Sequence, residues 1–137
     1  MKNILMSLAI VFLISSCKQE IDLSNISGYW EIDKVILEDG SERDYGVNTT
    51  VDYIELKSDS TGIRKKLSPR LDGTFSTTED FESFKIKENN GDLFIQYETP
   101  MMSWDEELLN LNETTLEVKN DHSIRYIYKR FEPINLE

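Results

Sequence analysis

Apolar and polar residues alternate along most of the chain beyond residue 28, and the alternation has a period of two. Leu116 and Val118 are separated by Glu117 and followed by Lys119, so one face of this run is apolar and the other is charged. A period of two is typical of a half-buried β-strand. Similar runs cover residues 54–57, 93–98 and 124–129. The pattern therefore predicts a series of short strands.

Turn-forming residues separate these runs. They are Asp39-Gly40, Ser60-Thr61-Gly62, Asp72-Gly73 and Asn90-Gly91, and such residues adopt positive φ at low cost. Short strands between such turns predict an all-β fold, an antiparallel up-and-down meander. Two connections, residues 39–50 and 69–79, are long, and loops of that length in a compact domain often carry function.

The first predicted strand changes phase along its length. Trp30 and Ile32 share one face, whereas Val35 and Leu37 fall on the opposite phase. A shift of one residue near residues 33–34 predicts a β-bulge or bend, which allows a sheet to curl and close.

Residues 103–110 fit two interpretations. Ser103 and Glu106 have the spacing of a helix capping box and precede Leu108 and Leu109. A strand or irregular sheet edge agrees better with the neighbouring runs. A strand and a short helix therefore both remain open for this segment.

The first residues form a separate unit. Met1-Lys2-Asn3 gives a short positive start, and residues 4–14 form an apolar stretch of 11 residues that only Ser7 interrupts. This stretch is too short to span a bilayer, which needs about 20 residues, but it fits the apolar region of a secretory signal. We expect residues 1–16 to be a signal peptide that is removed.

The next residues, Ile14-Ser15-Ser16-Cys17, resemble the lipobox of bacterial lipoproteins. The resemblance implies that Cys17 is acylated, becomes the first residue of the mature chain and attaches it to the membrane through several acyl chains. Cys17 is the only cysteine, so an exported chain has no internal disulfide partner for it. Acylation would remove an otherwise free and reactive thiol.

A polar segment follows the cysteine. We expect residues 17–27 to be the acylated cysteine and a polar tether, and residues 28–137 to be the folded domain. Lys18-Gln19-Glu20-Ile21-Asp22 resembles the signals that send some lipoproteins to the outer face of the outer membrane. The resemblance implies a lipid-anchored protein of the bacterial outer membrane, and it favours the cell-surface face over the periplasmic face.

The charge of the chain argues against two classes of partner. The 137 residues include 26 acids and 15 bases, giving a formal net charge of −11. Nucleic-acid binding requires clustered Lys and Arg, so no nucleic-acid partner is expected. Electrostatic docking on anionic lipid is disfavoured for the same reason.

Residues suited to catalysis are sparse. The only histidine, His122, lies in Asn120-Asp121-His122-Ser123, which predicts an exposed hairpin turn. There is no second histidine for a zinc site and no nucleophile or phosphate-binding motif. We expect no enzyme activity, no catalytic residues, no metal and no cofactor.

Three segments resemble lipocalin-like domains of bacterial lipoproteins. Gly28-Tyr29-Trp30 is similar to the Gly-x-Trp signature of lipocalins, residues 126–130 are similar to the closing strand, and residues 109–118 are similar to the penultimate hairpin. The resemblance implies a small barrel of about eight strands. It also implies that Trp30 closes one end of the barrel and that Arg130 stacks on it. The second lipocalin signature, Thr-Asp-Tyr, is absent.

Two functions fit this picture. In the first, the barrel is hollow and binds a small apolar ligand, with inward aromatic side chains as candidate ligand contacts. Alternatively the barrel is solid and the protein binds another protein, as an inhibitor or as a subunit of a surface assembly, through exposed loop residues. The candidate ligand contacts are Tyr53, Phe84, Tyr97, Trp104, Tyr126 and Tyr128. The candidate protein contacts are Tyr45, Phe75, Met101 and Met102.

Overall fold

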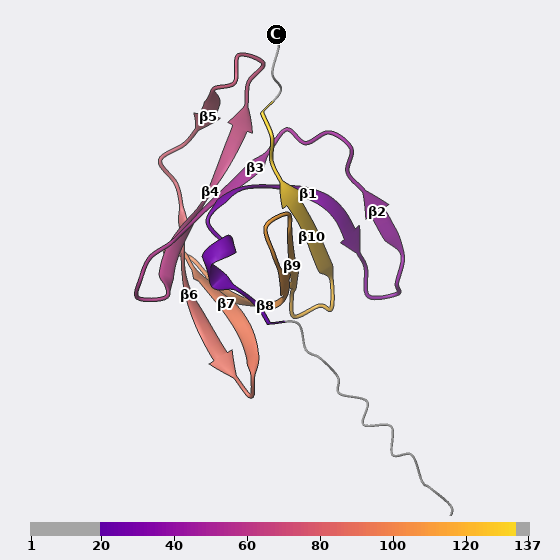
Figure 1. Cartoon of the computed structure of the whole chain (residues 1–137), viewed down its shortest axis with the longest axis vertical. Coiled ribbons are helices and arrows are strands. Elements are labelled where there is room, and N and C mark those ends of the chain that lie inside the picture. Colours follow the sequence, from indigo (N-terminus) through magenta and orange to yellow (C-terminus); the bar gives the residue numbers. More distant parts are fainter. Residues whose placement is uncertain (1–19, 134–137) are drawn as a thin grey trace, which may run out of the picture.

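A computed structural model describes residues 20–133. A single turn of 3₁₀ helix, η1 (Leu23–Asn25), precedes ten strands (Figure 1). The strands are β1 (Gly28–Ile36), β2 (Glu42–Asp44), β3 (Val51–Leu56), β4 (Thr61–Pro69), β5 (Phe75–Thr77), β6 (Glu82–Asn89), β7 (Asp92–Glu98), β8 (Ser103–Leu111), β9 (Thr115–Lys119) and β10 (Arg125–Arg130). No helix within residues 20–133 is long and apolar enough to cross a membrane.

Eight of these strands close into an antiparallel barrel. Neighbouring strands follow the order β10-β9-β8-β7-β6-β4-β3-β1, and β1 also pairs with β10, which joins the two edges. The short strands β2 and β5 lie within the two long connections and pair with β1 and β4. The all-β, up-and-down, eight-stranded barrel predicted from the sequence is confirmed.

The predicted bulge in β1 is present and allows this strand to serve three neighbours. The pairing with β10 shifts register between Ile32 and Lys34, which leaves Asp33 as the extra residue. Before the bulge β1 pairs with β3, and after it β1 pairs with β2. After the shift Val35 is opposite Tyr126, whose side chain packs against the core. The bend therefore returns apolar side chains to the barrel interior.

Residues 103–110 form strand β8, so the strand interpretation is correct and the helix interpretation is wrong. Trp104 pairs with Tyr97, Glu106 with Ile95 and Leu108 with Leu93 along β7. Pairing with β7 places alternate residues of β8 on the inner face of the barrel, as in any strand. This tertiary pairing outweighs the local capping signal.

The segment before β1 belongs to the folded domain. Ile26 is fully buried, and Ile21 and Leu23 pack against the core. Asp22 caps η1 by accepting a hydrogen bond from the backbone N–H of Ser24. The predicted tether is therefore wrong for residues 21–27, because three apolar side chains in this stretch cover one end of the barrel.

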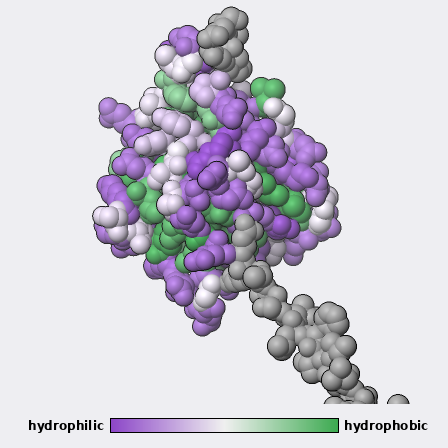
Figure 2. Space-filling view, viewed as in Figure 1, coloured by the Kyte–Doolittle hydropathy of each residue, from purple (hydrophilic) through white to green (hydrophobic). Residues whose placement is uncertain are grey.

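The outer surface is mainly hydrophilic with separate hydrophobic areas, as the face drawn in Figure 2 shows. The apolar side chains with the highest exposure lie in the connections, at Val47, Leu71, Met101 and Met102. The barrel interior holds the main apolar core, to which Trp30, Tyr97 and Ile95 contribute fully buried side chains.

Candidate functional site

One end of the barrel, here called the closed end, is sealed by Trp30 and Arg130. The guanidinium carbon of Arg130 lies 3.8 Å from the centre of the Trp30 ring. The Nε1–H of Trp30 donates a hydrogen bond to the carbonyl oxygen of Ile26 at 2.8 Å. Arg130 donates to the carbonyl oxygens of Ser27, Asn25 and Glu113. The stacked pair therefore ties η1 to the last strand of the barrel.

Gly28 is required by this arrangement. Its φ of +131° lies in a region that other residues rarely adopt. A Cβ atom at this position would also lie 2.5 Å from Nη1 of Arg130. The glycine of the Gly-x-Trp motif thus leaves space for the arginine that covers the tryptophan.

Five of the six aromatic residues predicted as ligand contacts belong to the interior. Phe84 and Tyr97 are in the core cluster, and their rings meet edge to face at 5.8 Å. Trp104 stacks on Tyr97 at 5.1 Å between ring centres. Tyr126 and Tyr128 are half-buried and pack against the same core. These rings fill the middle of the barrel and leave a void of only about 10 Å³.

Tyr53, the sixth residue, is a wrong prediction because it faces outward. Trp30 faces inward and is opposite Asp52, so the next residue of β3 points to the outside. The Tyr53 ring lies 5.0 Å from the ring of Tyr29, which in turn stacks on Phe75 at 5.2 Å. Tyr53 therefore belongs to an aromatic cluster on the outer surface.

Charged side chains are buried inside the other half of the barrel. Arg64 is 7% exposed, and its guanidinium carbon lies 4.1 Å from the centre of the Tyr97 ring. Its Nε donates to Glu82 at 2.5 Å, and its Nη1 lies 3.8 Å from Oε2 of Glu106. Glu106 is 8% exposed, and this Oε2 atom has no hydrogen-bond partner.

The pKa values in this cluster are displaced by burial and by neighbouring charges. Burial raises the pKa of Glu106, and the attraction of Arg64 reduces this rise without cancelling it. Burial also raises the pKa of Tyr97 and of Tyr128. For Arg64 burial works to lower the pKa, but Tyr97 and the neighbouring carboxylates outweigh it and raise the value. The cluster therefore favours a charged arginine beside a carboxyl group that binds its proton tightly.

A second ion pair lies nearer the opening. Oδ1 of Asp52 accepts a hydrogen bond from Nζ of Lys66 at 2.6 Å. The carboxylate is almost fully buried, whereas the lysine side chain is 56% exposed. The two residues are paired directly across β3 and β4. The lysine thus reaches from the surface to a carboxylate inside the barrel.

The barrel has a hollow beside this ion pair, at the end that we call the open end. The hollow has a volume of about 310 Å³ and is bordered by the connection between β2 and β3. Three of its lining residues, Trp30, Asp52 and Tyr128, also line the small inner void beside Arg64 and Glu106. The hollow therefore leads from the surface toward the buried charges. Its other lining side chains include Ile32, Tyr45, Asn48 and Lys66.

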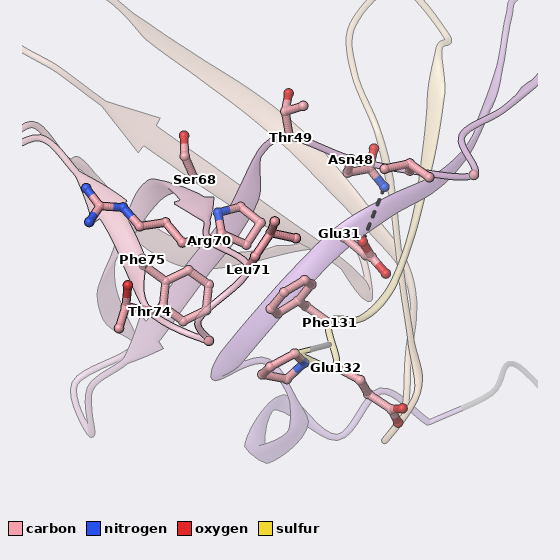
Figure 3. A pocket seen from close by; sticks show the side chains of 15 residues that line it. Glu31, Asn48, Thr49, Ser68, Arg70, Leu71, Thr74, Phe75, Phe131 and Glu132 are labelled. Carbon is pink, nitrogen blue, oxygen red and sulfur yellow. Dashed lines mark hydrogen bonds between the residues drawn. The ribbon is translucent and has the colours of Figure 1, made fainter. Parts of the chain in front are cut away.

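A larger groove lies on the outside of the barrel. It has a volume of about 520 Å³ and runs between the β4–β5 hairpin, the β2–β3 connection and the residues after β10. Figure 3 shows the rings of Phe75 and Phe131 with Leu71 beside them. Glu31 forms part of the wall and accepts a hydrogen bond from Nδ2 of Asn48 at 3.4 Å (Figure 3). The groove has a largely apolar lining.

The remaining predicted contact residues differ in their exposure. Met101 and Met102 are strongly exposed in the β7–β8 turn, and Tyr45 lies at the rim of the hollow. Phe75, predicted to be exposed, is instead half-buried because it stacks on Tyr29 and contacts Phe131. His122 lies in the β9–β10 turn with its side chain 78% exposed, as predicted.

Two further predictions concern Cys17 and a metal site. Cys17 lies outside the described residues. Within residues 20–133 no group of three or more His, Cys, Asp or Glu side chains is arranged to hold a metal ion.

The buried charges Asp52, Arg64 and Glu106 were missed as site residues. The sequence carries one signal for them, which is their phase. Asp52 is in phase with Ile54, and Glu106 is in phase with Trp104 and Leu108. Charges on the inner face of a strand are rare, so this phase alone indicated residues with a special environment.

A closed eight-stranded antiparallel barrel with a tryptophan–arginine pair at one end defines a lipocalin-like protein. The sequence profile of the family described as the lipocalin-like domain matches residues 26–118. The chain belongs to this family.

Two solved structures are similar to the chain. One is a lipocalin-like protein from Bacteroides uniformis, which is 11% identical, with a TM-score of 0.48 and coverage of 78% of this chain and 99% of that one. The other is an uncharacterized protein from Bacteroides eggerthii, which is 8% identical, with a TM-score of 0.48 and coverage of 77% and 98%. No curated protein matches the chain.

Proposed function

We propose that this chain is a lipid-anchored binding protein without enzyme activity, which takes a small ligand in the hollow at the open end of its barrel. The hollow itself is the observation that carries the proposal. Its volume of about 310 Å³ compares with about 300–1,000 Å³ for small-molecule sites. Its walls combine three aromatic rings, Ile32 and Val47 with five polar residues, so the hollow offers both apolar contact and fixed polar groups.

The ligand site lies near the opening because the middle of the barrel is filled. The inner void of about 10 Å³ has room for no more than about one water molecule. Tyr97, Trp104 and Phe84 occupy the space that a deeper ligand would need. Of the predicted ligand contacts, Tyr128 is the one that lines the hollow.

The absence of an enzyme activity is proposed on the nature of the polar residues. His122 is exposed in a turn on the surface and does not line the hollow. The buried charges are held mainly by one another, through Arg64 with Glu82 and Lys66 with Asp52. Such pairs suit recognition of a bound group, and no serine, cysteine or histidine accompanies them among the residues that line the hollow.

Native mass spectrometry of the protein purified from its own host tests the binding function. We expect a small molecule to remain bound to the folded protein and to be lost when Tyr128→Ala opens the wall of the hollow. Tyr29→Ala, on the outer surface, is the matched control and retains the molecule. A protein partner in place of a small molecule would contradict the proposal.

Membrane attachment is proposed on the lipobox-like residues 14–17. We expect cells fed an alkyne-labelled palmitate to label the protein and the Cys17→Ala variant to remain unlabelled. Surface biotinylation of intact cells distinguishes the cell-surface face of the outer membrane from the periplasmic face. An unlabelled parent protein would exclude acylation and with it the lipid anchor.

Protein binding is a second candidate function, and the outer groove favours it. The groove is larger than the hollow, and Phe75, Leu71 and Phe131 give it an apolar lining. A stoichiometric protein that copurifies with the parent chain and is lost from Leu71→Asp would support this function. Leu71 is 73% exposed, so the substitution leaves the core intact.

A further inference from the structure

The charged side chains around the hollow indicate the sign of the charge on its ligand. Five ionisable side chains approach one another at this end of the barrel: Asp52, Glu82 and Glu106 are acids, and Arg64 and Lys66 are bases. Of the three acids, Asp52 is the one that lines the hollow. An anionic ligand would have to lie beside this buried carboxylate, whereas a cation could pair with it.

Lys66 is the most exposed member of this group. Its side chain is 56% exposed, whereas that of Arg64 is 8% exposed and is fixed against Tyr97. The ammonium of Lys66 donates a hydrogen bond of 2.6 Å to the buried Asp52 carboxylate. A lysine ammonium is a compact charge on a flexible stem, so it can leave without disturbing the strand. Its departure would expose a buried carboxylate at the wall of the hollow.

We propose that the hollow binds a small organic ammonium ion, whose charged nitrogen replaces Nζ of Lys66 on Asp52 and whose apolar body lies against Trp30, Ile32 and Tyr128. This inference deepens the proposed function and rests on it. The ion pair already present shows the geometry that the ligand nitrogen would reproduce. The lysine supplies a positive charge but does not fill the hollow. A free amine with an apolar body would supply the charge and fill the hollow as well.

Two other features support a cationic ligand. The rings of Tyr45 and Tyr128 line the hollow, and aromatic faces attract ammonium groups. The acidic net charge of the chain also draws cations toward the protein.

Calorimetric titration of the full chain tests the proposal with three probes of nearly the same shape. They are 2-phenylethylamine, the neutral 2-phenylethanol and the anionic phenylacetate. We expect the amine to bind at least tenfold more tightly than the alcohol, and we expect no binding of the anion. Equal binding of amine and alcohol would overturn the ammonium inference and leave a small-ligand function intact.

Substitutions at the ion pair separate displacement from general electrostatics. Lys66→Met removes the competing ammonium, so we expect it to tighten amine binding several-fold. Lys65→Met is the matched control: it removes the same charge from the adjacent, outward position and leaves the affinity unchanged. Asp52→Asn should weaken amine binding at least tenfold, with circular dichroism confirming that the variant is folded.

Two further results would overturn the inference. One is weaker amine binding to Lys66→Met than to the parent chain, since the lysine would then assist the ligand and not compete with it. The other is the failure of all three probes to bind either protein. Native mass spectrometry of the host-purified protein distinguishes these results from failure of the proposed function. If a bound molecule without an ammonium group is found, the small-ligand function stands and only the ammonium inference fails.

Discussion

The closed end and the open end of the barrel are built from different side chains. At the closed end Trp30 is fully buried under Arg130, and Leu111 and Leu116 continue the apolar packing. At the open end Arg64 and Glu106 are buried among aromatic rings, beside a hollow. The same eight strands thus pass from an apolar interior to a charged one within their own length.

The difference indicates which end contributes more to the stability of the fold. Burial of apolar surface stabilises a fold by about 25 cal/mol per Å², whereas a buried ion pair is often no better than apolar residues of the same volume. The charges at the open end are therefore weak contributors to stability. Folding alone does not favour their presence in the interior, and the proposed ligand site would account for it.

Trp30→Ala should produce the largest effect. Truncating a fully buried aromatic side chain costs about 3–5 kcal/mol of unfolding free energy, and here it also removes the support of Arg130. Chemical denaturation measures the change. Trp104→Ala at the open end, where the side chain is half-buried, should cost less. An unchanged denaturation midpoint for Trp30→Ala would show that the closed end is not the stabilising one.

Gly62→Ala should have the next largest effect. A Cβ atom at this position would overlap the carbonyl oxygen of Glu55 and the ring of Phe84, so the strand or the ring must move. Overpacking of this kind costs about 1–3 kcal/mol. Gly46→Ala is the control, because no atom lies within 4 Å of the added Cβ. Equal thermal stability of the two variants would contradict the tight packing.

Arg130→Lys should have a smaller effect. It keeps the charge but loses the flat guanidinium that covers Trp30 and donates to Ser27, Asn25 and Glu113. We expect a loss of about 0.5–2 kcal/mol, the range of a cation–π contact. Arg43→Lys, on exposed β2, should be silent in the same denaturation experiment. A silent Arg130→Lys would mean that any cation suffices at the closed end.

Glu106→Gln should have the smallest effect and one that depends on pH. Burial raises the pKa of Glu106 above its ordinary value of 4.5, so the folded state binds this proton more tightly than the unfolded state. The stability that this tighter proton binding contributes is therefore complete below pH 4.5 and is lost as the pH rises through the folded-state pKa of Glu106. The glutamine variant lacks this loss, so it should gain stability relative to the parent as the pH rises.

Denaturation between pH 4 and pH 8 measures this difference. Exposed Glu55→Gln is the control and should follow the pH dependence of the parent chain. A Glu106→Gln curve parallel to that of the parent would show that the carboxyl group titrates as it does in the unfolded chain. The open end would then be less apolar than its burial indicates.

The alternation of residues allowed the sequence to predict much of the closed end. The phase change in β1 located the bulge near residues 33–34, and the resemblance of the Gly-x-Trp motif to lipocalins placed Trp30 beside Arg130. Both features follow from local pattern or from a family signature. Tyr53 was misplaced because its inward direction was inferred from residue type, while its phase with Glu55 pointed outward.

The open end was harder to predict for a physical reason. Acidic and basic residues are frequent in this chain, so a charge on the inner face of one strand is easily taken for a surface residue. Asp52 and Arg64 are buried only because neighbouring strands supply their partners. These pairings depend on register across the barrel. A period of two predicts that a strand exists but does not specify which strand lies beside it.

The hydrogen bond from Arg130 to Asn25 joins residues 105 positions apart. Together with the β1–β10 ladder, it means that the ring of strands cannot be completed until the last strand has left the ribosome. Until then β1 presents an unpaired edge, the kind of surface on which nascent chains aggregate. Folding of this domain is therefore a late event with respect to synthesis, and a chain that ends before β10 would carry an unclosed sheet.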